Sequence, residues 1–422
     1  MRIGLFTDSY PPYINGVSTS VETLKYALEA EGHIVYVVTV GQDATTYSYD
    51  EEKHILKVPG LPLGIYDYRA ASIYPLKVIK KIRSWNLDVI HSQTELCMGI
   101  FARLLAKQYH IPLVHTYHTM YKDYTYYVSR NHKYFDMGCK KAVEYLSKFY
   151  CDNTADAFIV PTIKTYHLFR DEYHYNKEIY IVPTGIDSSR FNRENVDMLK
   201  VGEMRKKLGY KKNDFVYLFV GRMAQEKNIL FLLEAMEEIK RNRKSNIKLL
   251  LVGDGPDKDL YDKKMKEMEL TDCVKFFGSA PWSDMPLYYH LSQAFLTASV
   301  TETQGLTVIE ALAAEKPVLC IEDEAFHTMV VDKLNGMFFN DVSTCVKEMI
   351  ELSTNKKEYN LLKKQTKSSI KSYSLSSFAN SVLDVYKVAI DNFNNKKDFP
   401  NIVHNTVKKL FDKKEDEEWK LS

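Results

Sequence analysis

The stretch RIGLFTDSYPPYINGVSTSVETLKYALEAEGHIVYVVTV, residues 2–40, contains two apolar runs on either side of an amphipathic run. Residues 3–7 and 34–40 are short and apolar, so each predicts a strand. Between them, after a loop with two prolines, apolar residues recur at helical spacing up to Gly32. We therefore predict a β-α-β unit at the start of the chain.

The same alternation continues through both halves of the chain. In the first half, further short apolar strands are predicted at residues 89–91, 113–116 and 158–160. In the second half a new series starts, with strands predicted at 215–220, 247–252, 274–277 and 294–298 and a helix at 229–241. Strands that alternate with helices indicate parallel sheets covered on both faces. The predicted fold class is therefore α/β, doubly wound in each half.

The chain length predicts more than one domain. A chain of 422 residues is too long for one hydrophobic core, because cores stop growing at roughly 250 to 300 residues. We predict a first domain over residues 1–190 and a second over 191–377, because the polar segment 188–212 is most simply a linker or the first helix of a new domain. A closing helix is predicted at 378–395, and residues 396–422, rich in Lys, Asp and Glu, are predicted to form a polar tail.

Composition disfavours several classes of protein. Hydrophobic residues make up 45% of the chain and charged residues 27%, as in a globular rather than a disordered protein. The formal net charge of +2 gives no support to nucleic-acid binding. Six cysteines without a C-x-x-C pair predict neither a disulfide framework nor a zinc site and favour a reducing compartment. With no signal-peptide pattern and no apolar run near the roughly 18 residues of a membrane span, we expect a cytoplasmic protein with only peripheral membrane contacts.

The loop after the first strand ends with Asn15 and Gly16, just before the first predicted helix. Free amides and the helix dipole favour an anion at such a position, so Gly16 is a candidate anion-binding residue. The alternative is a turn glycine with positive φ. No G-x-G-x-x-G follows the strand, which disfavours an NAD-dependent oxidoreductase.

Two cations flank the start of a helix in the second half. Arg222 follows the strand predicted at 215–220, and Lys227 precedes the helix predicted from about Asn228. Cations at the carboxyl end of a strand, beside a helix start, can hold a diphosphate from opposite sides. The alternative is a pair of solvated surface cations.

The segment TETQGLTVIEALAA, residues 301–314, places Glu302 on a loop and Glu310 in the helix that follows. Carboxylates bind sugar hydroxyls well, whereas they would repel a diphosphate. Both acids are therefore candidates for binding ribose or hexose hydroxyls near the helix N-terminus. The alternative is that they only stabilise that N-terminus.

Four segments together resemble the retaining family-four glycosyltransferases over nearly the whole chain: GRMAQEKN at 221–228, VGDGP at 252–256, VPTGID at 182–187 and the E-x7-E run at 302–310. The resemblance implies the GT-B architecture, in which two Rossmann-like domains face each other across a cleft and a C-terminal helix crosses back to the first domain. It also implies roles for the donor-binding residues: Arg222 and Lys227 hold the donor diphosphate, Glu310 holds the ribose, Glu302 lies by the transferred sugar and acts in catalysis, the backbone of Thr303, Gln304, Gly305 and Leu306 contacts sugar and phosphate, Gly16 lies in the N-terminal glycine loop, and Ala280 and Met285 border the base.

Two stretches of the first half, HSQTE at 91–95 and HTYHTMYKDYTYY at 115–127, resemble the bacterial diacylglycerol glucosyltransferases, which transfer glucose from UDP-glucose to diacylglycerol. The resemblance implies that His118 is the active-site histidine and that Tyr121 and Lys122 line the acceptor side. The alternatives are a satisfied loop histidine and tyrosines that serve packing. Residues 130–151, where acceptor-binding elements lie, match that family only loosely.

From these residues we expect a retaining hexosyltransferase that moves glucose from UDP-glucose to diacylglycerol without a cofactor or metal. Arg222, Lys227 and nearby amides would stabilise the departing diphosphate. Asp257 and Asp259 form a D-x-D pattern, but they follow GDGP at a predicted helix start, where acids stabilise the N-terminus. The alternatives are another lipid or polysaccharide glycosyltransferase with a galactosyl or mannosyl donor, and a noncatalytic sugar-nucleotide-binding protein. The residues leave open glucose or galactose, one sugar or two, and the oligomeric state.

Residues 73–83, IYPLKVIKKIR, predict a basic amphipathic helix. The cations Lys77, Lys80, Lys81 and Arg83 fall on one arc of this helix, and Leu76, Val78, Ile79 and Ile82 fall on the other. An acceptor that stays in the bilayer requires docking, and anionic lipid attracts each nearby cation by about 1 kcal/mol. We therefore expect this helix to contact an anionic membrane surface at the inner face of the cell membrane. The alternative is an apolar arc that packs on its own domain beneath solvated lysines.

Overall fold

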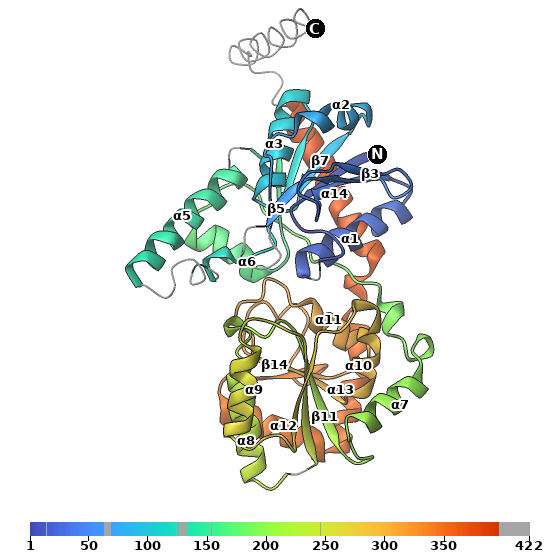
Figure 1. Cartoon of the computed structure of the whole chain (residues 1–422), viewed down its shortest axis with the longest axis vertical. Coiled ribbons are helices and arrows are strands. Elements are labelled where there is room, and N and C mark those ends of the chain that lie inside the picture. The colour runs from blue at the N-terminus through green and yellow to red at the C-terminus, as the bar shows by residue number, and fades with distance from the viewer. Residues whose placement is uncertain are drawn as a thin grey trace, which may run out of the picture.

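The computed structural model describes residues 1–13, 15–62, 69–123, 125, 133–152, 154–244 and 246–395. Figure 1 shows two lobes, one built from the first half of the chain and one from the second. The polar tail predicted at 396–422 lies outside the described residues.

The first lobe is built on an eight-stranded sheet of order β10-β9-β8-β7-β1-β2-β4-β3. Its paired neighbours run parallel, except for the antiparallel edge pair β3 and β4. The strands are β1 Arg2–Thr7, β2 Ile34–Val40, β3 Ser48–Asp50, β4 Ile55–Val58, β7 Val89–Ser92, β8 Leu113–Thr116, β9 Ala157–Val160 and β10 Tyr180–Ile181. A separate hairpin joins β5 Gly60–Pro62 to β6 Arg69–Ala71.

The second lobe is built on a six-stranded sheet of order β13-β12-β11-β14-β15-β16, and all its pairs are parallel. The strands are β11 Phe215–Val220, β12 Ile247–Val252, β13 Val274–Gly278, β14 Ala294–Thr297, β15 Val318–Ile321 and β16 Gly336–Phe339. In chain order this is 3-2-1-4-5-6, the order of a Rossmann sheet. The predicted doubly wound α/β fold is confirmed.

Helices cover both faces of the sheets. The first lobe carries α1 Gly16–Ala30, α2 Leu76–Ser84, α3 Cys97–Tyr109, α5 Lys133–Asp152 and α6 Ile163–His167. The second carries α7 Met198–Lys207, α8 Ile229–Arg241, α9 Lys258–Glu267, α10 Met285–Leu291, α11 Leu306–Ala313, α12 Val342–Thr354 and α13 Lys356–Ser369. Short 3-10 turns include η1 Tyr121–Asp123, η3 Ser188–Phe191, η5 Gln225–Lys227 and η6 Trp282–Asp284.

The strand at the centre of the second sheet shows why its sequence is a continuous apolar run. Tyr217 and Phe219 pack into the core on one face of the sheet, and Val216 and Leu218 pack into the core on the other. A strand covered on both faces has no solvent-facing side and therefore no polar alternation. The predicted range of this strand, residues 215–220, matches β11.

The last helix, α14 Leu375–Asn395, crosses back to the first lobe, as Figure 1 shows in orange-red. Its Phe378, Val382 and Tyr386 pack in the first-lobe core with residues of β1 and α1. The Tyr386 hydroxyl lies 2.8 Å from Nδ1 of the buried His91 at the end of β7. The closing helix predicted at 378–395 therefore begins three residues earlier than expected and packs against the first lobe.

Candidate active site

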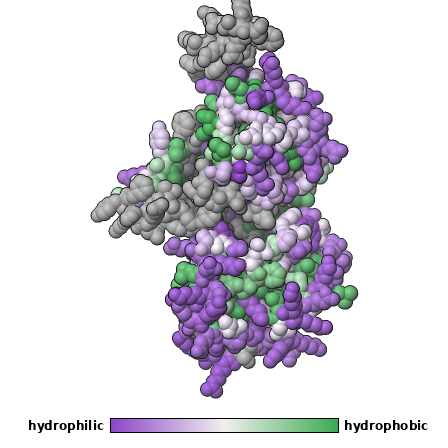
Figure 2. Space-filling model, in the orientation of Figure 1, coloured by the Kyte–Doolittle hydropathy of each residue, from purple (hydrophilic) through white to green (hydrophobic). Residues whose placement is uncertain are grey.

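The residues predicted to carry chemistry gather where the carboxyl ends of the two sheets approach each other. In doubly wound sheets, ligands bind at the point where the strand order reverses. That point lies between β1 and β7 in the first sheet and between β11 and β14 in the second. Thr162, just after β9, donates from its hydroxyl to the carbonyl of Thr303, after β14, at 2.7 Å. The two carboxyl edges therefore meet, and Figure 2 shows a waist between the lobes at this level.

Lys227 and Glu302 form the central ion pair of the second lobe, with Lys227 Nζ bonded to Glu302 Oε1. Their side chains are only 15% and 19% exposed, respectively. The 3-10 turn η5 carries Lys227 to the start of α8, and Glu302 lies on the loop after β14. Arg222 follows β11, and its Nη2 donates to Glu226 Oε1 at 2.7 Å. The predicted cations are therefore partly buried and paired with acids, rather than solvated surface charges.

Glu302 is held as a carboxylate. Burial by itself would raise the pKa of Glu302, but the Lys227 ammonium, a hydrogen bond from Ser299 and the charge of Lys164 outweigh it and lower that pKa below its usual 4.5. This corner of the site therefore carries a preorganised positive and a preorganised negative charge at neutral pH.

The glycines of VGDGP let the loop after β12 pack on the backbone that presents Arg222. A Cβ at Gly255 would lie 2.4 Å from the Met223 carbonyl oxygen, and one at Gly253 would lie 1.8 Å from the Gly221 carbonyl oxygen. Gly253 also has φ of +142°, which L side chains rarely adopt. The amide of Met223 donates to the Asp254 carbonyl at 2.9 Å. This motif therefore fixes the position of Arg222 by backbone contact.

The TETQG turn, residues 301–305, leads into α11 through a glycine with positive φ, and it also contacts Thr184 of the first lobe. Gly305 has φ of +85°, and a Cβ there would lie 2.9 Å from Phe326. The Gln304 carboxamide accepts from the Thr184 amide at 2.9 Å and donates to the Thr184 carbonyl at 3.0 Å. The side chain of Gln304 is thus used between the domains. Leu306 is the first residue of α11. The backbone contacts predicted for Thr303–Leu306 with sugar and phosphate stay predictions.

Glu310 lies on α11 in a polar pocket of the second-lobe core. Its carboxylate accepts from the Tyr289 hydroxyl at 2.8 Å and from the Trp282 indole nitrogen at 3.4 Å. Burial raises the pKa of Glu310 above 4.5, although those two hydrogen bonds and the Arg190 charge oppose the rise. The Arg190 guanidinium stacks over Trp282, 3.3 Å from the ring centroid, and its Nη1 is buried without a partner. Arg190 was not predicted as a site residue.

Ala280 and Met285 flank η6, the turn that carries Trp282. Ala280 is partly buried against the core, and Met285 is buried in it with 6% of its surface exposed. Both positions therefore adjoin the Trp282 and Glu310 pocket, and their contact with a base stays a prediction.

His118 is the predicted active-site residue on the first-lobe side of the site. Its Nε2 lies 2.7 Å from Oε1 of Gln93, and because an amide oxygen only accepts, Nε2 must carry the proton. Burial lowers the pKa of His118 to about 4, so the ring is neutral at pH 7. Gln93 is 2% exposed, and its own Nε2 has no hydrogen-bond partner. His118 is thus a held, neutral imidazole rather than a loosely placed loop residue.

Tyr121 and Lys122 lie on η1, directly after the His118 loop. The Tyr121 hydroxyl donates to Oε2 of the buried Glu95 at 2.5 Å, and Lys122 Nζ donates to the carboxylate of Glu172 at 2.8 Å. Nε2 of His115 lies 3.1 Å from the other oxygen of Glu95. Glu95 therefore orients Tyr121, a role that the sequence alone did not indicate.

Gly16 is the first residue of α1, and Asn15 caps the helix by accepting from the Ser18 amide at 2.9 Å. Gly16 is not among the residues with positive φ, so the alternative of a left-handed turn glycine is wrong. A Cβ at Gly16 would meet nothing within 4 Å. The helix was expected to begin near Ser18, and it begins two residues earlier because Asn15 supplies the cap.

Two of three consecutive acids, residues 322–324, pair with the first lobe across the seam between the domains. Asp323 accepts from Lys164 Nζ at 2.6 Å, and the same ammonium donates to the Val300 carbonyl at 2.8 Å. Glu324 lies 3.2 Å from His167 Nδ1, and Glu322 pairs with His327. Lys164 and His167 belong to α6 of the first lobe, so two of these pairs hold the lobes together.

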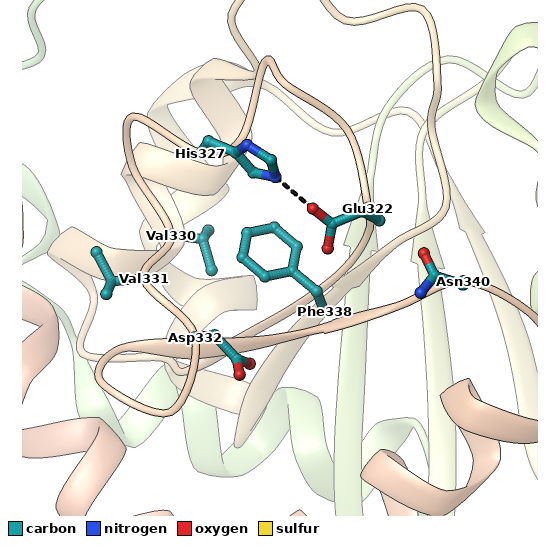
Figure 3. A pocket seen from close by; sticks show the side chains of 7 residues that line it. All are labelled: Glu322, His327, Val330, Val331, Asp332, Phe338 and Asn340. Carbon is teal, nitrogen blue, oxygen red and sulfur yellow. Dashed lines mark hydrogen bonds and ion pairs between the residues drawn. The ribbon is translucent and has the colours of Figure 1, made fainter.

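A hollow of about 550 Å³ lies beyond this seam, lined by residues around the ends of β15 and β16. Figure 3 shows His327 bonded to Glu322 above Phe338, with Asp332 and Asn340 on the rim. None of the predicted site residues lines this hollow. The predicted chemistry therefore lies at the switch points, two strands away.

Asp257 and Asp259 lie at the N-terminus of α9, as the interpretation of the D-x-D pattern expected. Asp257 is the N-cap residue, and Asp259 lies in the first turn. Among the residues that the structure describes, no group of three or more His, Cys, Asp or Glu side chains is placed to hold a metal ion.

The basic helix predicted at 73–83 is α2, which begins after Pro75. Its cations Lys77, Lys80, Lys81 and Arg83 are all exposed. Of the predicted apolar arc, Val78, Ile79 and Ile82 pack into the first-lobe core, whereas Leu76 is 72% exposed. Leu76 is the first residue of α2. Lys81 lies 3.5 Å from Glu51 and over the Tyr49 ring.

Two family models match the chain, one on each lobe. The model "Glycosyltransferase Family 4" matches residues 14–190, and "Glycosyl transferases group 1" matches residues 200–369. No helix in the described ranges has both the length and the apolar character that crossing a bilayer requires.

Similar proteins are found over the full length of the chain. The chain is 35% identical to the alpha-monoglucosyldiacylglycerol synthase of Acholeplasma laidlawii over 94% of this chain and 99% of that protein. It is 32% identical to the synthase of the same name from Streptococcus pneumoniae, over 94% of this chain and 88% of that protein. Anabaena HepE in complex with UDP-glucose has a similar structure, with a TM-score of 0.70, 15% identity, and coverage of 92% of this chain and 99% of that one. The likeness confirms the GT-B architecture.

Proposed function

This chain belongs to the family of the alpha-monoglucosyldiacylglycerol synthases, and from that membership we propose that it transfers glucose from UDP-glucose to diacylglycerol. The observation that carries the proposal is the 35% identity to the Acholeplasma laidlawii synthase over 99% of that protein's length. The charged site at the junction of the two sheets supports it, because a nucleotide-sugar transferase needs cations for a diphosphate and carboxylates for sugar hydroxyls.

The donor would lie against the second lobe. Arg222 and Lys227, partly buried beside the start of α8, would hold the diphosphate and stabilise the charge that grows on it as the glycosidic bond breaks. Glu302, bonded to Lys227, would hold the transferred sugar. Glu310, at the Trp282 and Tyr289 pocket, would bind the ribose. Because Lys227 and Glu302 are bonded to each other, the bound donor would contact both side chains at once, its diphosphate at Lys227 and its sugar at Glu302.

The acceptor would approach from the first lobe, where His118, Tyr121 and Lys122 lie. A neutral His118 donates through Nε2 to Gln93, which leaves Nδ1 as the nitrogen that can accept a hydrogen bond from a sugar or acceptor hydroxyl. Tyr121 is oriented by Glu95. The two lobes would thus supply different halves of the reaction, the leaving group from the second and the acceptor from the first.

We infer further that the reaction retains the α configuration and needs no metal. Glu302, the carboxylate assigned to the transferred sugar, is already paired with Lys227, so the acceptor would attack on the face that the diphosphate leaves, with Arg222 and Lys227 supplying the positive charge. The test is a product analysis of the purified protein with UDP-glucose and diacylglycerol in mixed micelles. Mass spectrometry should show one hexose per lipid, and the anomeric proton should show the coupling of an α linkage.

Three other outcomes would change the proposal in different ways. A β-linked product would contradict retention. Transfer from UDP-galactose or GDP-mannose, but not from UDP-glucose, would show that the donor is a different nucleotide sugar. UDP-glucose binding without any transfer or hydrolysis would indicate a noncatalytic binding protein.

A lipid acceptor also requires a membrane contact, and we propose that α2 provides its electrostatic part at the inner face of the cell membrane. Lys77, Lys80, Lys81 and Arg83 are exposed together, and Leu76 is exposed beside them. Vesicles that contain phosphatidylglycerol should bind the protein at low salt and release it at high salt. Changing Lys77, Lys80 and Lys81 to Ser should weaken this binding without harming UDP-glucose hydrolysis. Unchanged binding would contradict the role of α2.

A further inference from the structure

Helix α5 exposes more large apolar side chains than any other helix in the described part of the chain. Met137 is 54% exposed, Tyr145 71% and Leu146 49%. No other helix of the described ranges carries more than one exposed large hydrophobic residue. Figure 1 shows α5 projecting from the side of the first lobe rather than lying flat on its sheet. The side chains described on this helix are those of residues 136–148.

The exposed face of α5 consists of two adjacent rows at helical spacing. Met137, Lys141 and Tyr145 form one row, and Gly138, Ala142 and Leu146 form the other, and all six are exposed. A helix face that meets water normally carries charged residues of both signs. This face carries one lysine and no acid. The acids of the same stretch are half-buried: Asp136 lies outside the two rows, and Glu144 borders them, three residues after Lys141.

The opposite side of α5 fixes the helix beside the acceptor side of the site. Asp136 accepts from the Thr125 hydroxyl at 2.6 Å, and Ser147 is buried. Thr125 also donates to the carbonyl of Lys122, on the 3-10 turn η1 that carries Tyr121. The helix is therefore held through its polar side to the wall of the acceptor site, with its apolar rows turned outward.

We propose that the outward face of α5, residues 137–146, docks into the surface of the lipid bilayer that holds the acceptor. The inference rests on the proposed function, because that function places the acceptor in a bilayer. Three features favour a bilayer over a second copy of the chain as the occupant. The face combines aliphatic side chains with an interfacial tyrosine, its exposed charge is positive, and it lies next to the acceptor side of the site.

The docking through α5 differs from docking through α2 in its response to salt. The apolar arc of α2 is buried in the core, so α2 offers a bilayer mainly cations, and salt screens their attraction. The exposed rows of α5 offer apolar area, which salt does not screen. The part of vesicle binding that survives high salt therefore belongs to α5.

The experiment compares two triple variants of the full chain by sedimentation with phosphatidylcholine vesicles that contain diacylglycerol. One carries Met137→Ser, Tyr145→Ser and Leu146→Ser. The matched control carries Leu199→Ser, Leu260→Ser and Leu361→Ser, three leucines of the second lobe that are exposed to a similar or greater degree. We expect the α5 variant to lose at least about tenfold of the salt-resistant binding, since insertion of a helix scales with its apolar area, and the control to lose none.

Two further measurements separate the possible failures. UDP-glucose hydrolysis and melting temperature should stay unchanged in the α5 variant, and the conservative variant Met137→Leu with Leu146→Met should bind like the unmodified chain. Salt-resistant binding that persists in the α5 triple variant would overturn the proposal. A dimer in sedimentation velocity that becomes a monomer in this variant would also overturn it, by assigning the face to self-association. If α5-dependent vesicle binding occurs but no glucolipid forms, the proposed function fails and the docking surface stands.

Discussion

Lys227 and Glu302, separated by 75 positions in the chain, form an ion pair between the start of α8 and the loop after β14. Each side chain is mostly buried, so each would be left as an unpaired charge if the other were removed. The pair also joins the two loops that flank the switch point of the second sheet. Its charges therefore stabilise the fold and, in the proposed function, hold the donor.

Stability and activity should separate at this pair. Lys227→Met and Glu302→Gln should each lower turnover at least about a hundredfold, the usual scale for the loss of one transition-state stabiliser. The single variant Lys227→Met should also lower the melting temperature, because it leaves Glu302 buried without its partner. The double variant should regain much of the lost stability but none of the activity. Near-normal turnover in either single variant would remove that residue from the site.

His118 should stay neutral far below the usual histidine range. Burial lowers its pKa to about 4 from 6.5, so its ring resonances should not titrate between pH 8 and pH 5 in NMR spectra of histidine-labelled protein. In urea-unfolded protein they should titrate near 6.5. His118→Asn identifies the resonance by its loss. A titration of the folded protein near pH 6.5 would contradict the buried, Gln93-bonded ring.

The same shift makes a prediction for stability. Because the folded-state pKa of His118 lies below the unfolded value, the unfolded chain binds more protons between pH 4 and pH 6.5. The contribution is therefore complete above pH 6.5 and is lost as pH falls towards 4, by at most about 3 kcal/mol. Urea unfolding of the unmodified chain and of His118→Asn should converge as the pH rises from 4.5 to 7 if the asparagine is otherwise neutral. Asp8 has the opposite effect on the pH dependence of stability, because burial raises its pKa to about 6. This effect is the same in the unmodified chain and in His118→Asn, so it does not alter their difference.

The Lys164 contacts should hold the two lobes in their observed relation. Lys164→Ala removes both its bond to Asp323 and its bond to the Val300 carbonyl, so we expect a loss of about 2 kcal/mol and faster proteolysis between the lobes. Small-angle scattering should show a larger radius of gyration. The exchanged pair Lys164→Asp with Asp323→Lys should recover part of the loss. An unchanged scattering curve and melting temperature would show that the seam does not depend on this contact.

We predict that Lys316 destabilises the folded protein and that its replacement raises the free energy of unfolding. Burial, together with the charges of Lys363 and Arg193, lowers its pKa to about 7 from 10.5, so the folded protein holds this amine at a cost near neutral pH. Stability should rise with pH between 7 and 10.5, since the folded state binds fewer protons there. Lys316→Met should abolish this dependence and stabilise the protein by about 1 to 3 kcal/mol at pH 7. The exposed Lys364→Met is the matched control and should change little.

Activity should persist in excess EDTA. The proposed mechanism assigns the charge of the leaving diphosphate to Arg222 and Lys227, which are already held beside α8. Initial rates measured before and after dialysis against EDTA should agree. Full loss of activity that Mg²⁺ or Mn²⁺ restores would contradict the metal-free proposal.

Several elements could be predicted from the sequence within a residue because their signals are local. The runs at 34–40, 215–220 and 247–252 are continuous and apolar, and they match β2, β11 and β12. The four-residue strands β15 and β16 were not predicted, although β7, β8 and β9 have the same length and were, because so short an apolar run is ambiguous between strand and helix. Leu76 belongs to the predicted apolar arc of α2, but the sequence did not indicate that it is exposed. The helical spacing describes its arc but not where the core beneath the helix ends.

The candidate site likewise contains residues that could be predicted from the sequence and residues that could not. Recognisable sequence motifs contain Arg222, Lys227, Glu302, Glu310 and His118. The structure brings these residues to the carboxyl edges of the two sheets. Gln93, Glu95 and Arg190 carried no signal of a role, although Gln93 and Glu95 lie within the HSQTE motif. Their importance comes from the partners they meet: Gln93 orients His118, Glu95 orients Tyr121, and Arg190 stacks over Trp282 beside Glu310.

The sequence by itself determined the order and type of the elements, the two-domain organisation that we predict from them, and the residue types available at each strand end. These depend on periodicity and on backbone preferences over a few residues. Only the tertiary structure decided which polar groups meet, as in Lys227 with Glu302 and Gln304 with the Thr184 backbone, which lie 75 and 120 positions apart. Such pairs arise from the strand order of the sheets and the docking of the lobes. These bring distant segments within hydrogen-bond reach and set the burial that shifts each pKa.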